Sequence, residues 1–202
     1  MGEAGGNCAP RWEWRTFGAR LPEIEAKLGP TTRIAARQSD EIYLLNSTTP
    51  HSAKIRDGAL EIKQLLQVDS SGLEQWTPAF KERFPLSAAM LRSSFAALDL
   101  RPPTTRRDVY DFEEFLSEVG SNDEPMRAVE VKKARRQFIY RDCAAEFVRV
   151  NIGPVARESF CIESEDPSKV IAAVHEMGLD PHANINFPKG IERALALSTR
   201  AG

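Results

Sequence analysis

The stretch Ser52-Ala53-Lys54-Ile55-Arg56-Asp57-Gly58-Ala59-Leu60-Glu61-Ile62-Lys63 decides the fold. Apolar and charged residues alternate on both sides of Asp57-Gly58, a dipeptide that favours the tight turn of a β-hairpin. Successive side chains point to opposite faces of an extended strand. The stretch therefore predicts two antiparallel strands, each with one apolar face and one charged face.

Two further segments carry a similar pattern. Charged and apolar residues alternate in Val129-Glu130-Val131-Lys132. In residues 11–17 the side chains of Arg11, Glu13 and Arg15 lie on one face of the expected strand, and two tryptophans lie on the other face. Such charged faces fit two arrangements. They can lie in water and form cross-strand ion pairs, or they can line a closed sheet whose polar interior holds an anion and its metal ions.

The composition is that of an ordinary folded protein. The chain has 202 residues, of which 42% are hydrophobic and 28% charged, enough for one large domain or two small ones. The formal net charge of −2 argues against a general binder of nucleic acid or of anionic membranes. No apolar run is long enough to span a bilayer. Cysteines 8, 143 and 161 lack the CxxC spacing and are expected to be reduced thiols of a cytoplasmic protein.

The order of the expected elements favours an α+β fold. Residues 1–10 are expected to be a disordered tail before a single domain over 11–202, with a helical insertion at about 70–120. Strands are expected at 11–17, 33–34, 41–45, 52–56, 59–67, 128–132, 135–141, 144–151 and 157–163. Outside the insertion, helices are expected at 21–28, 166–178 and 191–197. The hairpins leave no room for crossover helices, so the sheet is expected to be mostly antiparallel.

Within the insertion, Trp76, Phe80 and Phe84 follow a helical spacing that is interrupted by Pro78. This aromatic stripe is expected to be core and not a cofactor site. Ser87 is a suitable cap for a second helix.

Charged residues of both signs on converging strand faces suit the chemistry of polyphosphates. Arginine and lysine bind phosphate oxygens, and arginine can bind two at once. Carboxylates hold Mg²⁺ or Mn²⁺, which bridges phosphate oxygens and can activate water. Strands that bring both kinds of residue together would therefore form a phosphate site.

Several short motifs occur in a particular order along the chain. They are Glu13-Trp14-Arg15, then Lys54-Ile55-Arg56, then Leu60–Lys63, then Arg135-Arg136, and last Ser159–Glu163 followed by Asp166-Pro167. This ordered set resembles the CYTH domain, or triphosphate tunnel metalloenzyme, superfamily, which includes inorganic triphosphatases, thiamine triphosphatases and class IV adenylyl cyclases. The motifs stand where that family has its ExExK strand, its basic RxR strand, a strand that ends in lysine, the basic strand of the second half, and the late ExE strand with its helix.

The resemblance implies a closed, mostly antiparallel β-barrel, a tunnel with a polar interior, flanked by helices and interrupted by the helical insertion. It implies that inorganic triphosphate or a nucleoside triphosphate binds inside with Mg²⁺ or Mn²⁺. The residues expected to bind phosphate are Arg15, Lys54, Arg56, Lys63, Lys132, Arg136 and Arg149. Those expected to hold the metal are Glu13, Glu61, Glu130 and Glu163.

A literal match to ExExK at Glu23–Lys27 is rejected as the family motif. It lies within the apolar stripe of the helix expected at 21–28, and its first and last residues have the i,i+4 spacing of a helix pair.

The sequence departs from the family pattern at four positions. Arg11 replaces the first glutamate of ExExK, and Arg15 replaces its lysine. Asn151 stands where an acidic residue is common. Cys161 replaces the first glutamate of the ExE pair, although Glu165 could supply an acid if the register shifts by two residues. The expected metal-binding set is therefore smaller, while the basic set is intact or enlarged.

These observations leave three hypotheses for the function. The leading one is a metal-dependent phosphohydrolase, a triphosphatase, for which no catalytic residue is assigned. An adenylyl cyclase-like enzyme would use the same cradle of cations. A protein that binds polyphosphate or a nucleotide without hydrolysing it is the alternative from another class.

Overall fold

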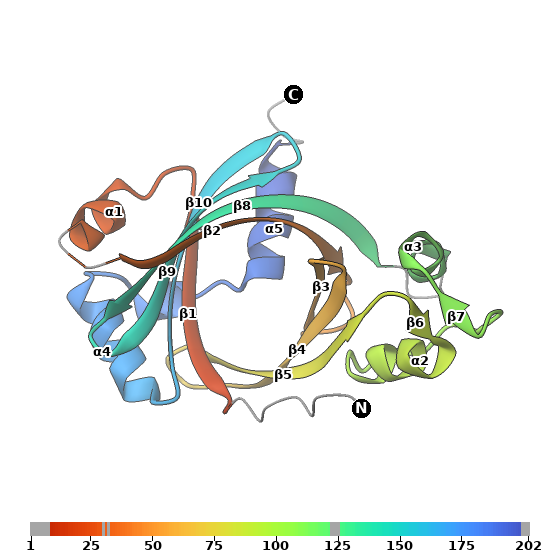
Figure 1. Cartoon of the computed structure of the whole chain (residues 1–202). Helices are drawn as coiled ribbons and strands as arrows, with labels where there is room; N and C mark the ends of the chain where they lie inside the picture. Colours follow the sequence, from red (N-terminus) through yellow and green to blue (C-terminus); the bar gives the residue numbers. More distant parts are fainter. Residues whose placement is uncertain (1–8, 30, 32, 122–125, 199–202) are drawn as a thin grey trace.

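The computed structural model describes residues 9–29, 31, 33–121 and 126–198. In these residues, eight strands close into an antiparallel barrel in the order β1-β10-β9-β8-β2-β3-β4-β5, and β5 pairs back onto β1 (Figure 1). The expected α+β fold with a closed barrel is confirmed. The barrel strands are β1 (Arg11–Gly18), β2 (Arg33–Leu45), β3 (Ser52–Arg56), β4 (Ala59–Val68), β5 (Glu74–Arg83), β8 (Arg127–Tyr140), β9 (Cys143–Ile152) and β10 (Val155–Ser164).

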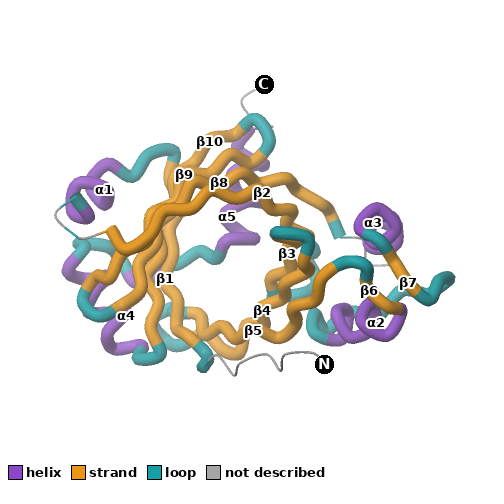
Figure 2. The backbone as a smooth tube through the Cα atoms, viewed as in Figure 1, coloured by secondary structure: helices purple, strands orange, loops and turns teal. Residues whose placement is uncertain are grey.

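Helices surround this ring of strands on three sides. Figure 1 shows α1 and α4 outside β1, β9 and β10, with α2 and α3 on the opposite side beyond β3 to β5, and Figure 2 shows α5 behind the ring. The helices are α1 (Pro22–Leu28), α2 (Ala88–Ala96), α3 (Phe112–Ser121), α4 (Pro167–Glu176) and α5 (Phe187–Ser198), with a short 3-10 helix at Pro181–Ala183 and a two-stranded sheet of β6 (Leu86–Ser87) and β7 (Val109–Tyr110). Among the described residues, no helix has the length and apolar character needed to cross a membrane.

The hairpin of β3 and β4 turns its apolar face outward. Ile55, Leu60 and Ile62 are buried against Phe95 of α2 and Phe115 of α3 in one apolar cluster. Burying this face against helices is favourable because it removes apolar surface from water. Side chains alternate along the strands, so the charged face of the hairpin has to point into the barrel.

Two other apolar clusters fix the remaining strands. Trp14 of β1 and Phe160 of β10 pack with Val170 and Val174 of α4 on the outside of the barrel. Inside one end of the barrel, Phe187 and Ile191 of α5 pack against side chains of β2, β8 and β9, namely Tyr43, Val129, Val131, Val148 and Val150. Helix α5 therefore closes that end.

Local signals in the sequence are borne out at the turns and caps. Asp57 and Gly58 have φ angles of 52° and 70°, the left-handed conformation that a two-residue hairpin turn requires. Ser87 begins α2, and its hydroxyl accepts a hydrogen bond of 3.2 Å from the Met90 N–H. The Asp166 side chain caps α4 in the same way through the Ser168 N–H, at 2.9 Å.

Two expectations need correction: one expected helix is a strand, and two pairs of expected strand pieces are single strands. Residues 74–83 form the barrel strand β5 and not a helix, so the insertion contains α2, α3, β6 and β7, all after β5. The strand pieces expected at 33–34 and 41–45 belong to one strand, β2, and those at 128–132 and 135–141 belong to one strand, β8. Of the tail expected at 1–10, residues 1–8 lie outside the described residues.

Candidate functional site

The interior of the barrel contains a cavity of about 480 Å³. Its wall comes from β1, β2, β3, β4, β5, β8, β9 and β10, and residues 186–188 at the start of α5 line it as well. The charged residues that line it are Arg11, Glu13, Arg15, Lys54, Arg56, Glu61, Lys63, Lys133, Arg135, Glu146 and Glu163. Seven are cationic and four are carboxylates, so the lining favours an anion.

A fifth carboxylate, Glu41 of β2, is buried in the barrel beside these cations. Its oxygens lie 3.1 Å from Lys133 Nζ and 3.5 Å from Lys54 Nζ, and it also accepts a hydrogen bond from Arg135. Burial opposes ionisation of Glu41, but the neighbouring ammonium and guanidinium groups outweigh it and hold the pKa of this carboxyl far below its usual range. Glu41 is therefore ionised and fixes several cations of the wall together.

Lys133 reaches into the cavity from β8. Its ammonium donates to the Tyr43 hydroxyl at 2.7 Å and lies 3.2 Å from the centroid of the Phe187 ring. Burial lowers the pKa of Lys133 well below its ordinary value, although Glu41 opposes the shift. A bound anion would stabilise the charged form of this lysine.

The carboxylates of the wall are each held by a cation. Glu13 Oε1 accepts from Arg15 Nε at 2.9 Å, and Glu163 Oε1 accepts from Arg11 Nη1 at 3.0 Å. Glu61 binds Arg56 at 3.0 Å and also lies 3.5 Å from Lys54. Burial raises the pKa of Glu13, but Arg15, Lys63 and Lys133 more than compensate, and the resulting pKa is lowered.

These residues do not fit a divalent metal ion. A Mg²⁺ or Mn²⁺ site needs several oxygen ligands on one ion. Among the described residues, no group of three or more histidine, cysteine, aspartate or glutamate side chains is placed to hold a metal. Glu13 and Glu163 are direct neighbours across β1 and β10, but each is paired with its own arginine.

The chain is similar in structure to several solved proteins, although its sequence matches no described family. No family model matches the sequence, and no curated protein matches it. A conserved protein from Pyrococcus furiosus aligns with a TM-score of 0.54 and 15% identity over 88% of this chain and 98% of its own. The PH1012 protein from Pyrococcus horikoshii aligns with a TM-score of 0.51 and 15% identity over 92% and 98%.

Both alignments take in nearly the whole of the neighbouring chain, so these proteins share the overall fold of this chain. We call the charged interior of this barrel the tunnel. An adenylyl cyclase candidate from Hippeastrum, described as having a dominant triphosphatase activity, aligns with a TM-score of 0.46 and 12% identity over 85% of this chain and 89% of its own, too distant a likeness to bear on function.

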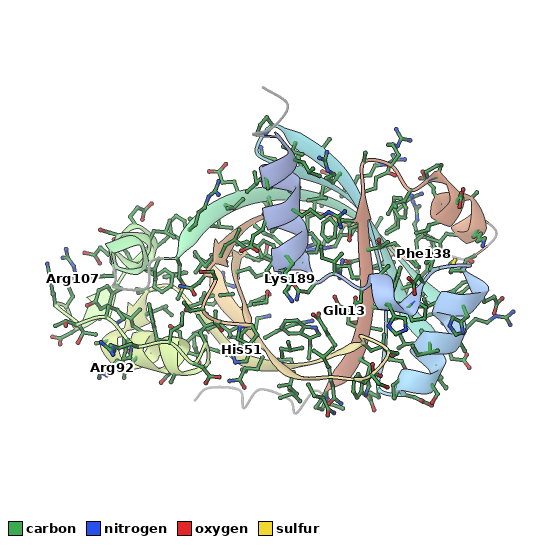
Figure 3. All side chains as sticks on the ribbon, turned by 180° about the vertical axis from the view of Figure 1, so that it is seen from behind. Glu13, His51, Arg92, Arg107, Phe138 and Lys189 are labelled. Atoms are coloured by element: carbon green, nitrogen blue, oxygen red, sulfur yellow. The ribbon has the colours of Figure 1, made fainter. Side chains whose placement is uncertain are left out.

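The tunnel wall contains most of the residues expected to form the site. Of the expected phosphate-binding residues, the structure places Arg15, Lys54, Arg56 and Lys63 on the cavity. Of the expected metal ligands, it places Glu13, Glu61 and Glu163 there, and Figure 3 shows Glu13 on β1 from the side of α5. Arg56 also has a buried Nε–H without a hydrogen-bond partner among the described residues.

Four expected residues lie outside the tunnel, and this is a correction. Glu130 and Lys132 of β8 are exposed on its outer face. Arg136 and Arg149 both bind Glu25 of α1, at 2.5 and 3.0 Å, outside the barrel. The reason is strand register. From Val129 to Arg135 of β8 the odd-numbered residues are buried and the even-numbered ones are exposed, and on β9 Arg149 is exposed between the buried Val148 and Val150.

The expected sets missed several residues of the tunnel. Lys133 and Arg135 could have been found by continuing the alternation from Val129 and Val131 along one unbroken strand. Arg11 was noted only as a departure from the family motif, although it lines the cavity. Glu41 had no distinguishing signal in the sequence, because only its neighbours in space make it a special carboxylate.

Proposed function

We propose that the tunnel binds the phosphate chain of a triphosphate, either inorganic triphosphate or a nucleoside triphosphate. The observation that carries this proposal is the convergence of seven lysine and arginine side chains from four strands on one cavity. The cavity, at about 480 Å³, has the size of a small-molecule site. The structure supports a binding function more directly than a catalytic one.

The cations are already held in place before an anion enters. Glu41 fixes Lys54, Lys133 and Arg135, and the Glu61 carboxylate contacts Arg56 through both oxygens at 3.0 Å. Ordering long side chains in advance lowers the entropy that binding has to overcome. A chain of several phosphates can contact more of these cations at once than a single phosphate can.

Hydrolysis with Mg²⁺ or Mn²⁺ was the leading expectation from the resemblance. It requires carboxylates that can hold the metal, and the tunnel carboxylates are paired with guanidinium and ammonium groups instead. We therefore propose binding as the function, and hydrolysis is one outcome of the test.

Calorimetry with sodium triphosphate, ATP and orthophosphate tests the proposal, with and without Mg²⁺ or Mn²⁺. We expect saturable binding of triphosphate at one site per chain, at least about tenfold tighter than orthophosphate, because each added charge-assisted contact contributes about 1.5–3 kcal/mol. No binding of triphosphate or ATP under any condition would reject the proposal. A phosphate-release assay on the same samples shows whether a metal ion turns binding into hydrolysis.

A further inference from the structure

The part of the tunnel that most resembles a metal site is a row of three carboxylates. Glu13 of β1 is the register partner of Glu163 on β10 and of Glu74 on β5. Residues directly opposite one another in an antiparallel pair have side chains close together on one face of the sheet. Carboxylates from three neighbouring strands therefore follow one another around the wall.

Each carboxylate of this row already has its hydrogen-bond donors. Arg11 binds Glu163 at 3.0 Å and Arg15 binds Glu13 at 2.9 Å. Glu74 accepts from the Asn186 side-chain amide at 3.0 Å and from a tryptophan N–H at 3.2 Å. A metal ion bound through the Oε1 atoms of Glu13 and Glu163 would compete with the guanidinium groups of their arginines.

The wall beside the row also lacks an acid where one could have completed a metal site. Cys161 is the register partner of Arg15 and lines the cavity two residues from Glu163, on the same face of β10. It is a buried thiol and contributes no carboxylate oxygen. The positive charge of Arg15 thus faces a neutral side chain.

From this donor set we infer that the tunnel holds its polyphosphate without a divalent metal ion, with the guanidinium groups of Arg11 and Arg15 supplying the charge that a metal would supply. This inference rests on the proposed function. Cations outnumber carboxylates among the cavity-lining residues, so a divalent cation is repelled and a phosphate chain is attracted. Metal ions that bind the phosphate chain in solution neutralise part of its charge, and so they weaken its attraction to the tunnel.

Calorimetry on the full chain with sodium triphosphate separates the inference from the proposed function. We expect the affinity measured in EDTA to equal or exceed the affinity measured in excess Mg²⁺ or Mn²⁺. Any gain in affinity on adding either metal would overturn the inference and leave the proposed function standing. No binding under either condition would overturn both.

The variant Arg11→Gln tests the role of the guanidinium directly. It removes one cation and frees Glu163 beside Glu13, so we expect triphosphate affinity in EDTA to fall about tenfold, the effect of losing one charge-assisted contact. Arg20→Gln is the matched control, since Arg20 binds Glu158 at 3.1 Å on the outer face of the same strand, β10. Wild-type affinity in Arg11→Gln, or an equal loss in Arg20→Gln, would contradict the assignment.

Discussion

Glu41 and Lys133 form an ion pair of 3.1 Å between neighbouring strands β2 and β8, and their side chains are 0% and 3% exposed. The same carboxylate is bound by Lys54 at 3.5 Å and by Arg135. Taking charges out of water costs several kcal/mol per ion, and only close partners offset that cost. The carboxylate is therefore what allows several cations to gather inside a protein interior.

Replacing Glu41 with glutamine leaves those cations without their common partner. Removing one member of a buried ion pair costs about 3–5 kcal/mol, so we expect Glu41→Gln to lower the free energy of unfolding by about that amount. Glu130→Gln makes the same chemical change on the exposed face of β8 and should alter stability by less than about 0.5 kcal/mol. Urea denaturation of the two variants measures the difference, and equal stabilities would show that Glu41 has no such role.

The lowered pKa of Lys133 predicts how binding depends on pH. Burial favours the neutral amine, so in the folded protein Lys133 loses its proton well below the pH at which lysine ordinarily does so. Above that pH the tunnel has one positive charge fewer. We therefore expect triphosphate affinity, measured by calorimetry, to fall with rising pH already below the ordinary lysine pKa of about 10.4.

Loss of the Lys133 proton should lower triphosphate affinity without unfolding the protein, because the same titration has the opposite effect on stability. Between the pKa of Lys133 in the folded protein and its higher value in the unfolded chain, the unfolded state binds more protons, so this group makes stability rise with pH. Lys133→Arg keeps its charge across the whole range and should show a smaller fall in affinity. Some fall should remain because burial also lowers the pKa of Lys54. A fall as steep as that of the wild type would rule out Lys133 as its source.

The sequence predicted the two faces of each strand, but which face points into the barrel depends on where the helices pack. In β3 and β4 the charged face was correctly expected inside, and the structure shows why: α2 and α3 cover the apolar face. Val129 to Lys132 has the same alternation but the opposite outcome, since its valines pack with Phe187 inside the barrel and its charges face water. Periodicity defines two faces, but only tertiary packing decides which one is inside.

The error at β5 has a different cause. Trp76 and Phe80 are four residues apart, which places them on one side of a helix and equally on one face of a strand. The local pattern therefore could not distinguish the two. In the structure the segment is a strand, because β1 pairs with Glu74, Gln75 and Trp76 and so closes the barrel.

The packing of α2 on the apolar face of β3 and β4 can be tested by substitutions in α2. Phe95 is fully buried between this helix and the hairpin, whereas Met90 of the same helix is 36% exposed. We expect Phe95→Ala to lower the free energy of unfolding by about 3–5 kcal/mol. Met90→Ala should lower it by less than about 1 kcal/mol, because little apolar contact is lost. If urea denaturation gave the two variants the same stability, the helix would not be what holds the apolar face outward.

Two lysines that were both expected to bind phosphate differ in the structure in which way they face. Lys63 and Lys132 are both exposed, so replacing either with glutamine should leave stability almost unchanged. Only Lys63 lines the tunnel cavity. We expect Lys63→Gln to weaken triphosphate binding about tenfold, because one charge-assisted contact is lost, and Lys132→Gln to change it by less than about twofold.

Calorimetry at low and moderate salt completes this comparison. Loss of a contact inside the tunnel should persist at moderate salt, whereas a distant surface charge acts only through a field that salt screens within about 10 Å at 0.1 M. Equal losses in the two variants would mean that the phosphate chain contacts the outside of β8 as much as the inside of β4. The triphosphate would then lie on the outer surface of the barrel, and the cations of the bore would have another role.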